Sequence, residues 1–184
     1  MNILLRGEIG VGKSTVCQRL AELAWRESRS LSGALERSLF DETGRKMGIE
    51  VLDLASGERQ VLARSDGDLG GPPVGRYSFA ADALAWRQAI IVSSPPSDLL
   101  IIDELGPLEL GEAGNLAWVV AALQAGKTKH SVIVVRSSLV DRLRQRLLGI
   151  SFTLLSVSEA NRDSLPLEIY RMLFPGCEKN GGTG

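Results

Sequence analysis

Short, mainly apolar runs recur along the 184-residue chain and are separated by longer stretches in which apolar residues follow helical spacing. Three of these runs cover residues 2–6, 99–102 and 131–135, and a fourth covers residues 152–157. Runs of this kind are typical of strands that are buried on both faces of a parallel sheet. We therefore predict that these four segments form the core strands of the fold.

The stretches between the runs predict helices. After the first run, Val16, Leu20 and Leu23 recur at intervals that place them on one face of a helix beginning near Gly12. The same reasoning predicts further helices over residues 79–92, 115–124, 138–148 and 163–174. Alternating strands and helices favour an α/β fold of three layers, in which helices cover both faces of a mostly parallel central sheet.

A different pattern follows the first predicted helix. Residues 35–40, 47–54 and 60–63 are predicted strands, and the segments between them are short and rich in turn-forming residues. Such short connections favour an antiparallel strand meander over helix-linked parallel strands. Residues 65–73 hold glycines and prolines in close succession, so we expect a mobile loop without regular structure there.

The segment between the first predicted strand and the first predicted helix carries the clearest chemical signal. It matches the phosphate-binding P-loop pattern G-x-x-x-x-G-K-[ST]. Its glycines allow backbone angles that turn successive N–H groups towards a phosphate, and the following helix adds the positive end of its dipole. The predicted nucleotide-binding residues of this segment are Gly7, Glu8, Ile9, Gly10, Val11, Gly12, Lys13, Ser14 and Thr15.

Two side chains of the P-loop have specific predicted roles. The ammonium group of Lys13 is expected to contact the β- and γ-phosphates, which makes Lys13 a predicted catalytic residue. The hydroxyl of Ser14 is expected to ligate Mg²⁺. The alternative is a glycine-rich turn that contains a lysine by chance, and the flanking strand and helix favour the nucleotide site over it.

Two acids follow the apolar run at residues 99–102. We expect the strand next to the P-loop strand to carry an acid at its carboxyl end that holds Mg²⁺, and Asp103 fits that place. Glu104 is then the predicted general base, which orients or deprotonates an attacking water. The alternative for Glu104 is a solvated acid at the end of a strand.

Three more polar residues are candidates for the nucleotide site. No rigid segment obviously supplies an arginine finger, so Arg76, just beyond the glycine-rich loop, is the predicted cation for the γ-phosphate. The alternative is a surface arginine packed on Tyr77. Asn161 and Arg162 follow the last predicted strand, where they are expected either to contact the nucleobase or to form a purely structural turn.

The chain also resembles a known family, the THEP1 family of nucleoside-triphosphatases, which are P-loop proteins. The resemblance rests on four segments that occur in the family's order and span most of the chain. Gly44-Arg45-Lys46-Met47-Gly48 resembles G-x-R-x-G-F, Val74-Gly75-Arg76-Tyr77 resembles V-G-x-Y, Asp103-Glu104-Leu105-Gly106-Pro107-Leu108-Glu109-Leu110 resembles D-E-I-G-x-M-E-L, and Asn161-Arg162-Asp163-Ser164-Leu165-Pro166 resembles N-R-D-x-L-P. Arg136-Ser137-Ser138, after the run at 131–135, has no clear counterpart in the family. The resemblance implies a P-loop fold and the hydrolysis of nucleoside triphosphates.

Composition narrows the partners and the compartment. Hydrophobic residues make up 44% of the chain, charged residues make up 23%, and the formal net charge is −1 without a dense basic block, so we expect no nucleic-acid partner. The apolar runs are too short to cross a bilayer. Cys17 and Cys177 form no metal or redox spacing, which favours a reduced, cytoplasmic protein. We expect one domain over residues 1–174, a flexible tail over 175–184, and a monomer that is open to a protein partner.

The sequence therefore predicts a Mg²⁺-dependent enzyme that hydrolyses ATP or another nucleoside triphosphate to the diphosphate and phosphate. One alternative is a P-loop kinase that transfers the γ-phosphate to a small acceptor. The other is a nucleotide-dependent switch that acts on a protein partner.

Overall fold

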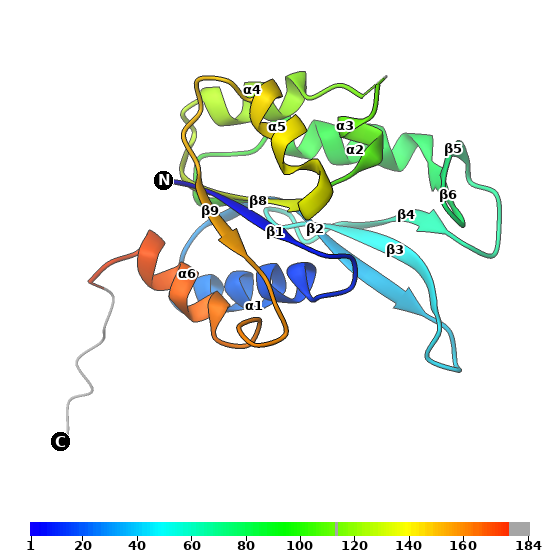
Figure 1. Ribbon diagram of the computed structural model, residues 1–184, viewed down its shortest axis with the longest axis horizontal. Coiled ribbons are helices and arrows are strands. Elements are labelled where there is room, and N and C mark those ends of the chain that lie inside the picture. The colour runs from blue at the N-terminus through cyan, green and yellow to red at the C-terminus, as the bar shows by residue number, and fades with distance from the viewer. Residues whose placement is uncertain (113, 177–184) are drawn as a thin grey trace.

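The computed structural model describes residues 1–112 and 114–176, so residues 177–184 of the predicted tail, Cys177 among them, lie outside the described residues. The described residues form nine strands of one sheet, in the order β5-β6-β4-β3-β2-β7-β8-β1-β9 (Figure 1). The strands are β1 (Asn2–Gly7), β2 (Leu31–Phe40), β3 (Lys46–Asp53), β4 (Arg59–Arg64), β5 (Gly70–Val74), β6 (Tyr77–Ala80), β7 (Ser97–Leu105), β8 (Thr128–Arg136) and β9 (Thr153–Ser156). The helices are α1 (Lys13–Arg26), α2 (Ala81–Val92), α3 (Pro107–Leu110), α4 (Ala117–Gln124), α5 (Val140–Arg146) and α6 (Leu165–Leu173), with a 3₁₀ turn, η1 (Ser137–Leu139), before α5.

Helices lie on both faces of this sheet. Helices α1 and α6 lie on one face, and α2, α4 and α5 lie on the other (Figure 1). Successive side chains of a strand point to opposite faces, so Ile3 and Leu5 of β1 join the core under α1 and α6, whereas Leu4 joins the core on the other side. Burying one Leu or Ile side chain fully stabilises the fold by roughly 1.5–3 kcal/mol. Because both faces of these strands are buried, their residues are apolar at successive positions.

The sheet is mixed, and the expectation of a mostly parallel sheet is wrong. Strands β2, β7, β8, β1 and β9 pair in parallel and are called the parallel half below. Strands β3, β4, β6 and β5 pair antiparallel and are called the antiparallel half, which continues the sheet from β2. The sequence correctly predicts the meander, but the meander adds to the central sheet and is not a separate layer.

The glycine-rich segment is also more regular than its sequence predicts. Instead of a loop over residues 65–73, β5 pairs with β6, with Gly70 opposite Ala80 and Val74 opposite Tyr77. Proline lacks the N–H group that an inner strand must donate, but β5 is the edge strand of the sheet and tolerates it. Since β6 extends to Ala80, helix α2 begins two residues later than the spacing predicts.

The order of the parallel strands corrects a second expectation. The strand that carries Asp103 does not lie beside the P-loop strand, because β8 lies between β7 and β1. The register pairs Ile102 with Ile133 and Gly7 with Arg136, so the carboxyl ends of all three strands meet at one edge. In open α/β sheets this edge is where ligands bind.

Among the described residues, no helix combines the length and the apolar character that crossing a bilayer requires.

Candidate active site

The P-loop joins the carboxyl end of β1 to the start of α1. Gly10 and Gly12 have φ values of 80° and 108°, a left-handed region that glycine adopts without strain. Gly12 caps α1, and no capping side chain accepts a hydrogen bond from the first N–H groups of the helix. These N–H groups and the helix dipole make the loop a site for an anion.

A cavity of about 250 Å³ opens in front of this loop. One wall is the P-loop, and the opposite wall is the hairpin formed by β2 and β3. The lining residues are Ile9, Gly10, Gly12, Lys13, Ser14, Thr15, Glu36, Arg37, Ser38, Lys46, Ile49, Glu104 and Arg136. Most of the predicted P-loop residues therefore share one cavity with the predicted general base, although the two segments are about 90 residues apart in the sequence.

Glu104 lies between two cations in this cavity. Its Oε2 is 3.2 Å from the Nζ of Lys13, and its Oε1 accepts a hydrogen bond of 2.7 Å from the Nε of Arg136. Lys13 also donates to the carbonyl of Glu8 at 2.9 Å. The Lys13 side chain is 4% exposed and that of Glu104 is 18% exposed, so solvent screens this pair little. Glu104 is a partnered residue of the site and not a solvated strand end.

Asp103 faces the start of α1. It is fully buried, and its Oδ1 accepts a hydrogen bond of 3.2 Å from the hydroxyl of Ser14. Its Oδ2 accepts one of 3.2 Å from the backbone N–H of Glu36. The two predicted metal ligands are therefore in direct contact, even though β8 lies between β7, which carries Asp103, and β1, which leads into the P-loop.

Burial controls the protonation of the two innermost carboxyls. Desolvation, and then the charge of Glu104, raise the pKa of Asp103 from 3.8 to about 7, against the lowering effect of the hydrogen bonds from Ser14 and Glu36. Desolvation also raises the pKa of Glu36 to about 8, although the charge of Arg87 opposes this shift. The ionised form of Asp103 is therefore poorly stabilised by the protein alone, and a bound cation would stabilise it.

Arg87 of helix α2 holds the rear of the site together. It is 2% exposed, donates to Glu109 Oε1 at 2.8 Å and to the carbonyl of Glu104 at 2.8 Å, and lies 3.7 Å from Glu36 Oε1. Glu109 in turn accepts a hydrogen bond of 2.8 Å from the N–H of Gly106, at the start of α3. A single guanidinium thus contacts the backbone of Glu104, the side chain of Glu36 in the middle of β2 and the side chain of Glu109 in α3.

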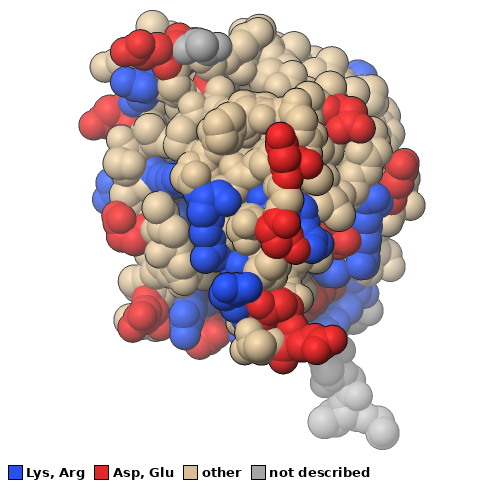
Figure 2. All heavy atoms as spheres, turned by 90° about the vertical axis from the view of Figure 1, so that its right-hand side faces the viewer, with Lys and Arg blue, Asp and Glu red and all other residues tan. Residues whose placement is uncertain are grey.

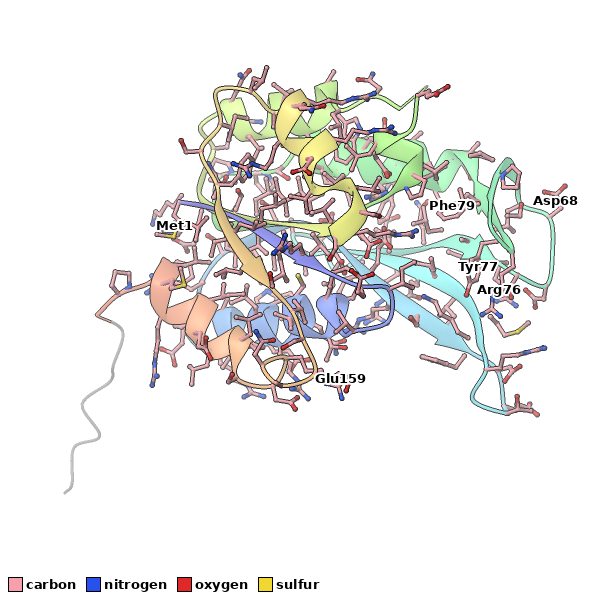
Figure 3. The ribbon with its side chains drawn as sticks, in the orientation of Figure 1. Met1, Asp68, Arg76, Tyr77, Phe79 and Glu159 are labelled. Atoms are coloured by element: carbon pink, nitrogen blue, oxygen red, sulfur yellow. The ribbon has the colours of Figure 1, made fainter. Side chains whose placement is uncertain are left out.

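Arg76 lies outside the cavity. It donates to the carbonyl of Lys46 at 2.8 Å and to the Tyr77 hydroxyl at 2.9 Å, and its guanidinium lies 5.1 Å from the centre of the Tyr77 ring. Figure 3 shows both side chains beside the β5–β6 hairpin, away from the P-loop. Figure 2 shows the face of the molecule on which the β2–β3 and β5–β6 hairpins lie, and basic and acidic side chains are interspersed there. The position of Arg76 matches the surface alternative, and a catalytic role remains an untested prediction.

Asn161 and Arg162 have different surroundings. The side chain of Asn161 accepts a hydrogen bond from the N–H of Ser158 at 2.8 Å and donates to the carbonyl of Ser156 at 2.9 Å, so it shapes the turn after β9. Arg162 packs against the P-loop, where a Cβ added to Gly12 would lie 3.3 Å from its Cδ. Of this pair, Arg162 is therefore the residue that lies next to the predicted nucleotide-binding segment.

Comparison with known proteins connects this site to a family. A family model described as NTPase matches residues 2–170. The chain is 33% identical over 182 residues to the nucleoside-triphosphatase THEP1 of Methanopyrus kandleri, a match that covers 97% of this chain and 98% of that protein. The chain belongs to the THEP1 family of nucleoside-triphosphatases.

Other THEP1 proteins and two solved structures agree with this assignment. The THEP1 of Thermofilum pendens is 33% identical over 172 residues, covering 92% of this chain and 93% of that one. A solution structure of a human cancer-related nucleoside triphosphatase aligns with a TM-score of 0.72 at 24% identity, covering 94% of this chain and 96% of that one. The crystal structure of THEP1 from Aquifex aeolicus aligns with a TM-score of 0.66 at 22% identity, covering 94% and 99%. At these identities the two structures support the fold alone.

Arg136, Arg87 and Glu36 line or contact this THEP1 site, and the sequence prediction gives none of them a role in it. Arg136 follows an apolar strand directly, the same signal that identifies Asp103, so the sequence could have identified it. Arg87 lies on the buried stripe of α2 with Ala83 and Ile91, where a charged residue indicates a buried partner. Glu36 gives no such signal, because its place depends on how β2 joins the two halves of the sheet.

Proposed function

We propose that the protein is a Mg²⁺-dependent nucleoside-triphosphatase that cleaves the bond between the β- and γ-phosphates. The observation that carries this proposal is the meeting of Lys13, Ser14 and Glu104 at one cavity, with the buried Asp103 accepting a hydrogen bond from Ser14. Each of these four side chains has a distinct role in the cleavage, and family membership supports the same reaction class. ATP and other nucleoside triphosphates are the proposed substrates.

The P-loop binds and orients the triphosphate. Its inward N–H groups and the N-terminus of α1 receive the phosphate oxygens. Lys13 leaves Glu104 and turns its ammonium to the β- and γ-phosphates, because the phosphate charge attracts it more strongly than one carboxylate does. Arg162 packs beside Gly12 and flanks the same bound phosphates.

The residues at the start of α1 suit Mg²⁺. This ion prefers oxygen ligands and is commonly held by one or two protein groups together with phosphates and water. The Ser14 hydroxyl and the Asp103 carboxylate would hold it, since both are oxygen donors and the raised pKa of Asp103 favours a cation beside it. When bound, Mg²⁺ supplies charge that neutralises the β- and γ-phosphates.

Glu104 positions the water that attacks the γ-phosphorus. The water oxygen forms the new bond to phosphorus, the bond from phosphorus to the bridging oxygen breaks, and its electron pair leaves with the diphosphate. Glu104 accepts the proton that the water loses. A positioned base of this kind contributes typically ~10²–10⁴-fold to a rate.

Phosphate release is the direct test of this function. The protein is incubated with a panel of ribo- and deoxyribonucleoside triphosphates, with and without Mg²⁺ and without any acceptor. We expect Mg²⁺-dependent release of phosphate from several of them, whereas a kinase would release little until a small acceptor is added. Stimulation only by a protein partner would favour the switch.

A pair of lysine variants makes the test specific to the cavity. Lys13→Ala should weaken triphosphate binding at least ~100-fold, the size of a lost set of charge-assisted hydrogen bonds. Lys129→Ala removes the same charge from a side chain that is 70% exposed and pairs with Asp98, and it should leave binding unchanged. Equal binding by both variants in a titration with a fluorescent nucleotide would contradict the P-loop assignment.

A further inference from the structure

The strand between β1 and β7 brings an arginine to the edge of the phosphate site. Arg136 is the last residue of β8, and the register places it directly beside Gly7, the first residue of the P-loop. Its side chain lines the same cavity as Lys13 and Glu104 and is 32% exposed. The register pairs Arg136 with Gly7 of β1 and its neighbour Val135 with Leu105 of β7, so the sheet fixes its place.

The contacts of Arg136 use only part of its guanidinium. Its Nε donates to Oε1 of Glu104 at 2.7 Å, while Lys13 takes the other oxygen of the same carboxylate. A guanidinium has five N–H donors in a planar fork, and four of them are on its two terminal nitrogens. Among the described residues, these terminal nitrogens have no hydrogen-bond partner. Arg136 therefore has donors left for an anion in the cavity.

The charge of the cavity favours that anion. Glu104 is the carboxylate that both Lys13 and Arg136 contact, so the two cations together exceed the charge of the group they share. When phosphate takes Lys13, the carboxylate of Glu104 retains Arg136. The guanidinium then spans the space between the general base and the phosphate bound in the P-loop.

We propose that Arg136 is the catalytic cation of this enzyme, which contacts the γ-phosphate through its terminal nitrogens while its Nε holds Glu104. This inference rests on the proposed function. The γ-phosphate is what separates a triphosphate from a diphosphate, so only with a triphosphate bound are the terminal nitrogens of Arg136 engaged as well as its Nε. Arg136 thereby aligns the general base with the phosphorus that the water attacks. A cation fixed by the sheet needs no movement of a loop to do this, in contrast to Arg76.

The test separates contact with phosphate from support of Glu104. Arg136→Gln, which keeps most of the side-chain length, is introduced both in the wild type and in Glu104→Gln. Affinities for Mg²⁺ with ADP, and with an ATP analogue that has a non-hydrolysable β–γ bridge, are measured in all four proteins. We expect the preference for triphosphate over diphosphate to fall at least ~10-fold with Arg136→Gln in both backgrounds, the size of a lost charge-assisted hydrogen bond.

Turnover provides the second readout. Arg136→Gln should lower kcat by ~10²–10³-fold, the usual effect of removing a donor that faces developing charge. Arg136→Lys keeps the charge without the planar fork, and it should retain more of the triphosphate preference than Arg136→Gln does. Arg144→Gln, on an exposed position of α5, is the matched control and should change neither quantity.

Two results would overturn the proposal. The first is an unchanged triphosphate preference in the Glu104→Gln background, which would reduce Arg136 to a support for Glu104. The second is an equal loss of affinity for both nucleotides, as a purely structural change would give. In either case the wild type would still release phosphate without an acceptor, whereas failure of the proposed function would appear as no release by the wild type.

Discussion

The parallel and antiparallel halves of the sheet differ in what they contribute to the site. In the parallel half, β1, β7 and β8 end at one edge and deliver the P-loop, the two acids and Arg136 there. In the antiparallel half each strand turns back on the next, so its strand ends are divided between two edges. That half supplies a wall of the cavity, including Lys46 and Ile49 of β3. Strand direction thus concentrates the chemistry in one half of a continuous sheet.

The largest expected effect concerns β2, the strand at which the two halves meet. There Arg87 of α2 contacts Glu36 of β2 and Glu109 of α3. Arg87→Met should lower the free energy of unfolding by about 3–5 kcal/mol, because it leaves buried carboxyls without their cation. The matched control is Arg59→Met in the antiparallel half, where Arg59 is 52% exposed and lies 3.6 Å from Glu50. An exposed pair of this kind contributes less than about 1 kcal/mol. Denaturant unfolding measures the loss of stability in both variants. Similar losses would show that the contacts of Arg87 stabilise the protein no more than an exposed ion pair does.

The second prediction divides the work of the two acids in the parallel half. Glu104→Gln should bind the Mg²⁺-nucleotide but hydrolyse it at least ~100-fold more slowly, because the amide cannot accept the proton of the water. Asp103→Asn should instead raise the Mg²⁺ concentration needed for half-maximal binding. Metal titrations and phosphate release on both variants test this division, and matching behaviour in the two assays would show it to be wrong.

The third prediction concerns the stability of the ligand-free protein against pH. Folding raises the pKa of Asp103 from 3.8 to about 7 and that of Glu36 from 4.5 to about 8, so the folded state holds protons that the unfolded state has released between these values. This contribution is complete below about pH 4 and is lost as the pH rises to about 8. For each proton that only the folded state holds, the free energy of unfolding falls by about 1.4 kcal/mol for every unit by which the pH rises.

Denaturant unfolding between pH 5 and 8 measures this slope. Asp41 and Asp98, whose pKa values are lowered to about 2, titrate below this window, whereas burial lowers the pKa of His130 from 6.5 and acts against the decline. Glu36→Gln removes one of the two groups and should flatten the decline. Stability that rises across the window in the absence of ligand would contradict the assignment of raised pKa values.

The smallest expected effect is in the antiparallel half, at Arg76. Arg76→Ala should change the rate by less than ~3-fold, since a surface substitution that loses no contact in the transition state costs little. The sequence-based alternative is that triphosphate draws residues 65–77 over the site. Slower hydrogen exchange of that segment with a non-hydrolysable triphosphate, together with a large loss of rate, would restore Arg76 as the catalytic cation.

The same division explains what the sequence could and could not predict. Buried parallel strands are apolar at successive positions, and the P-loop and Asp103-Glu104 follow them with fixed chemistry, so both the elements and the main residues are predictable. The β5–β6 pairing is not, because Pro72 and Pro73 are acceptable only on an edge that the rest of the sheet defines. The position of β8 between β7 and β1 also depends on tertiary packing. The contact between Arg136 and Glu104 follows from that position, so the sequence alone does not predict it.

The place of β1 within the sheet has a consequence for how the chain matures during synthesis. The neighbours of β1 are β8 and β9, and the side-chain hydrogen bond between Asn2 and Ser131 spans 129 residues. Strand β1 therefore has no sheet partner until β8, which begins at Thr128, has been synthesised. Pairings over such long separations form slowly, because loop closure must precede them. A nascent chain that ends before β8 consequently carries the complete P-loop sequence without the strand that aligns it with Asp103.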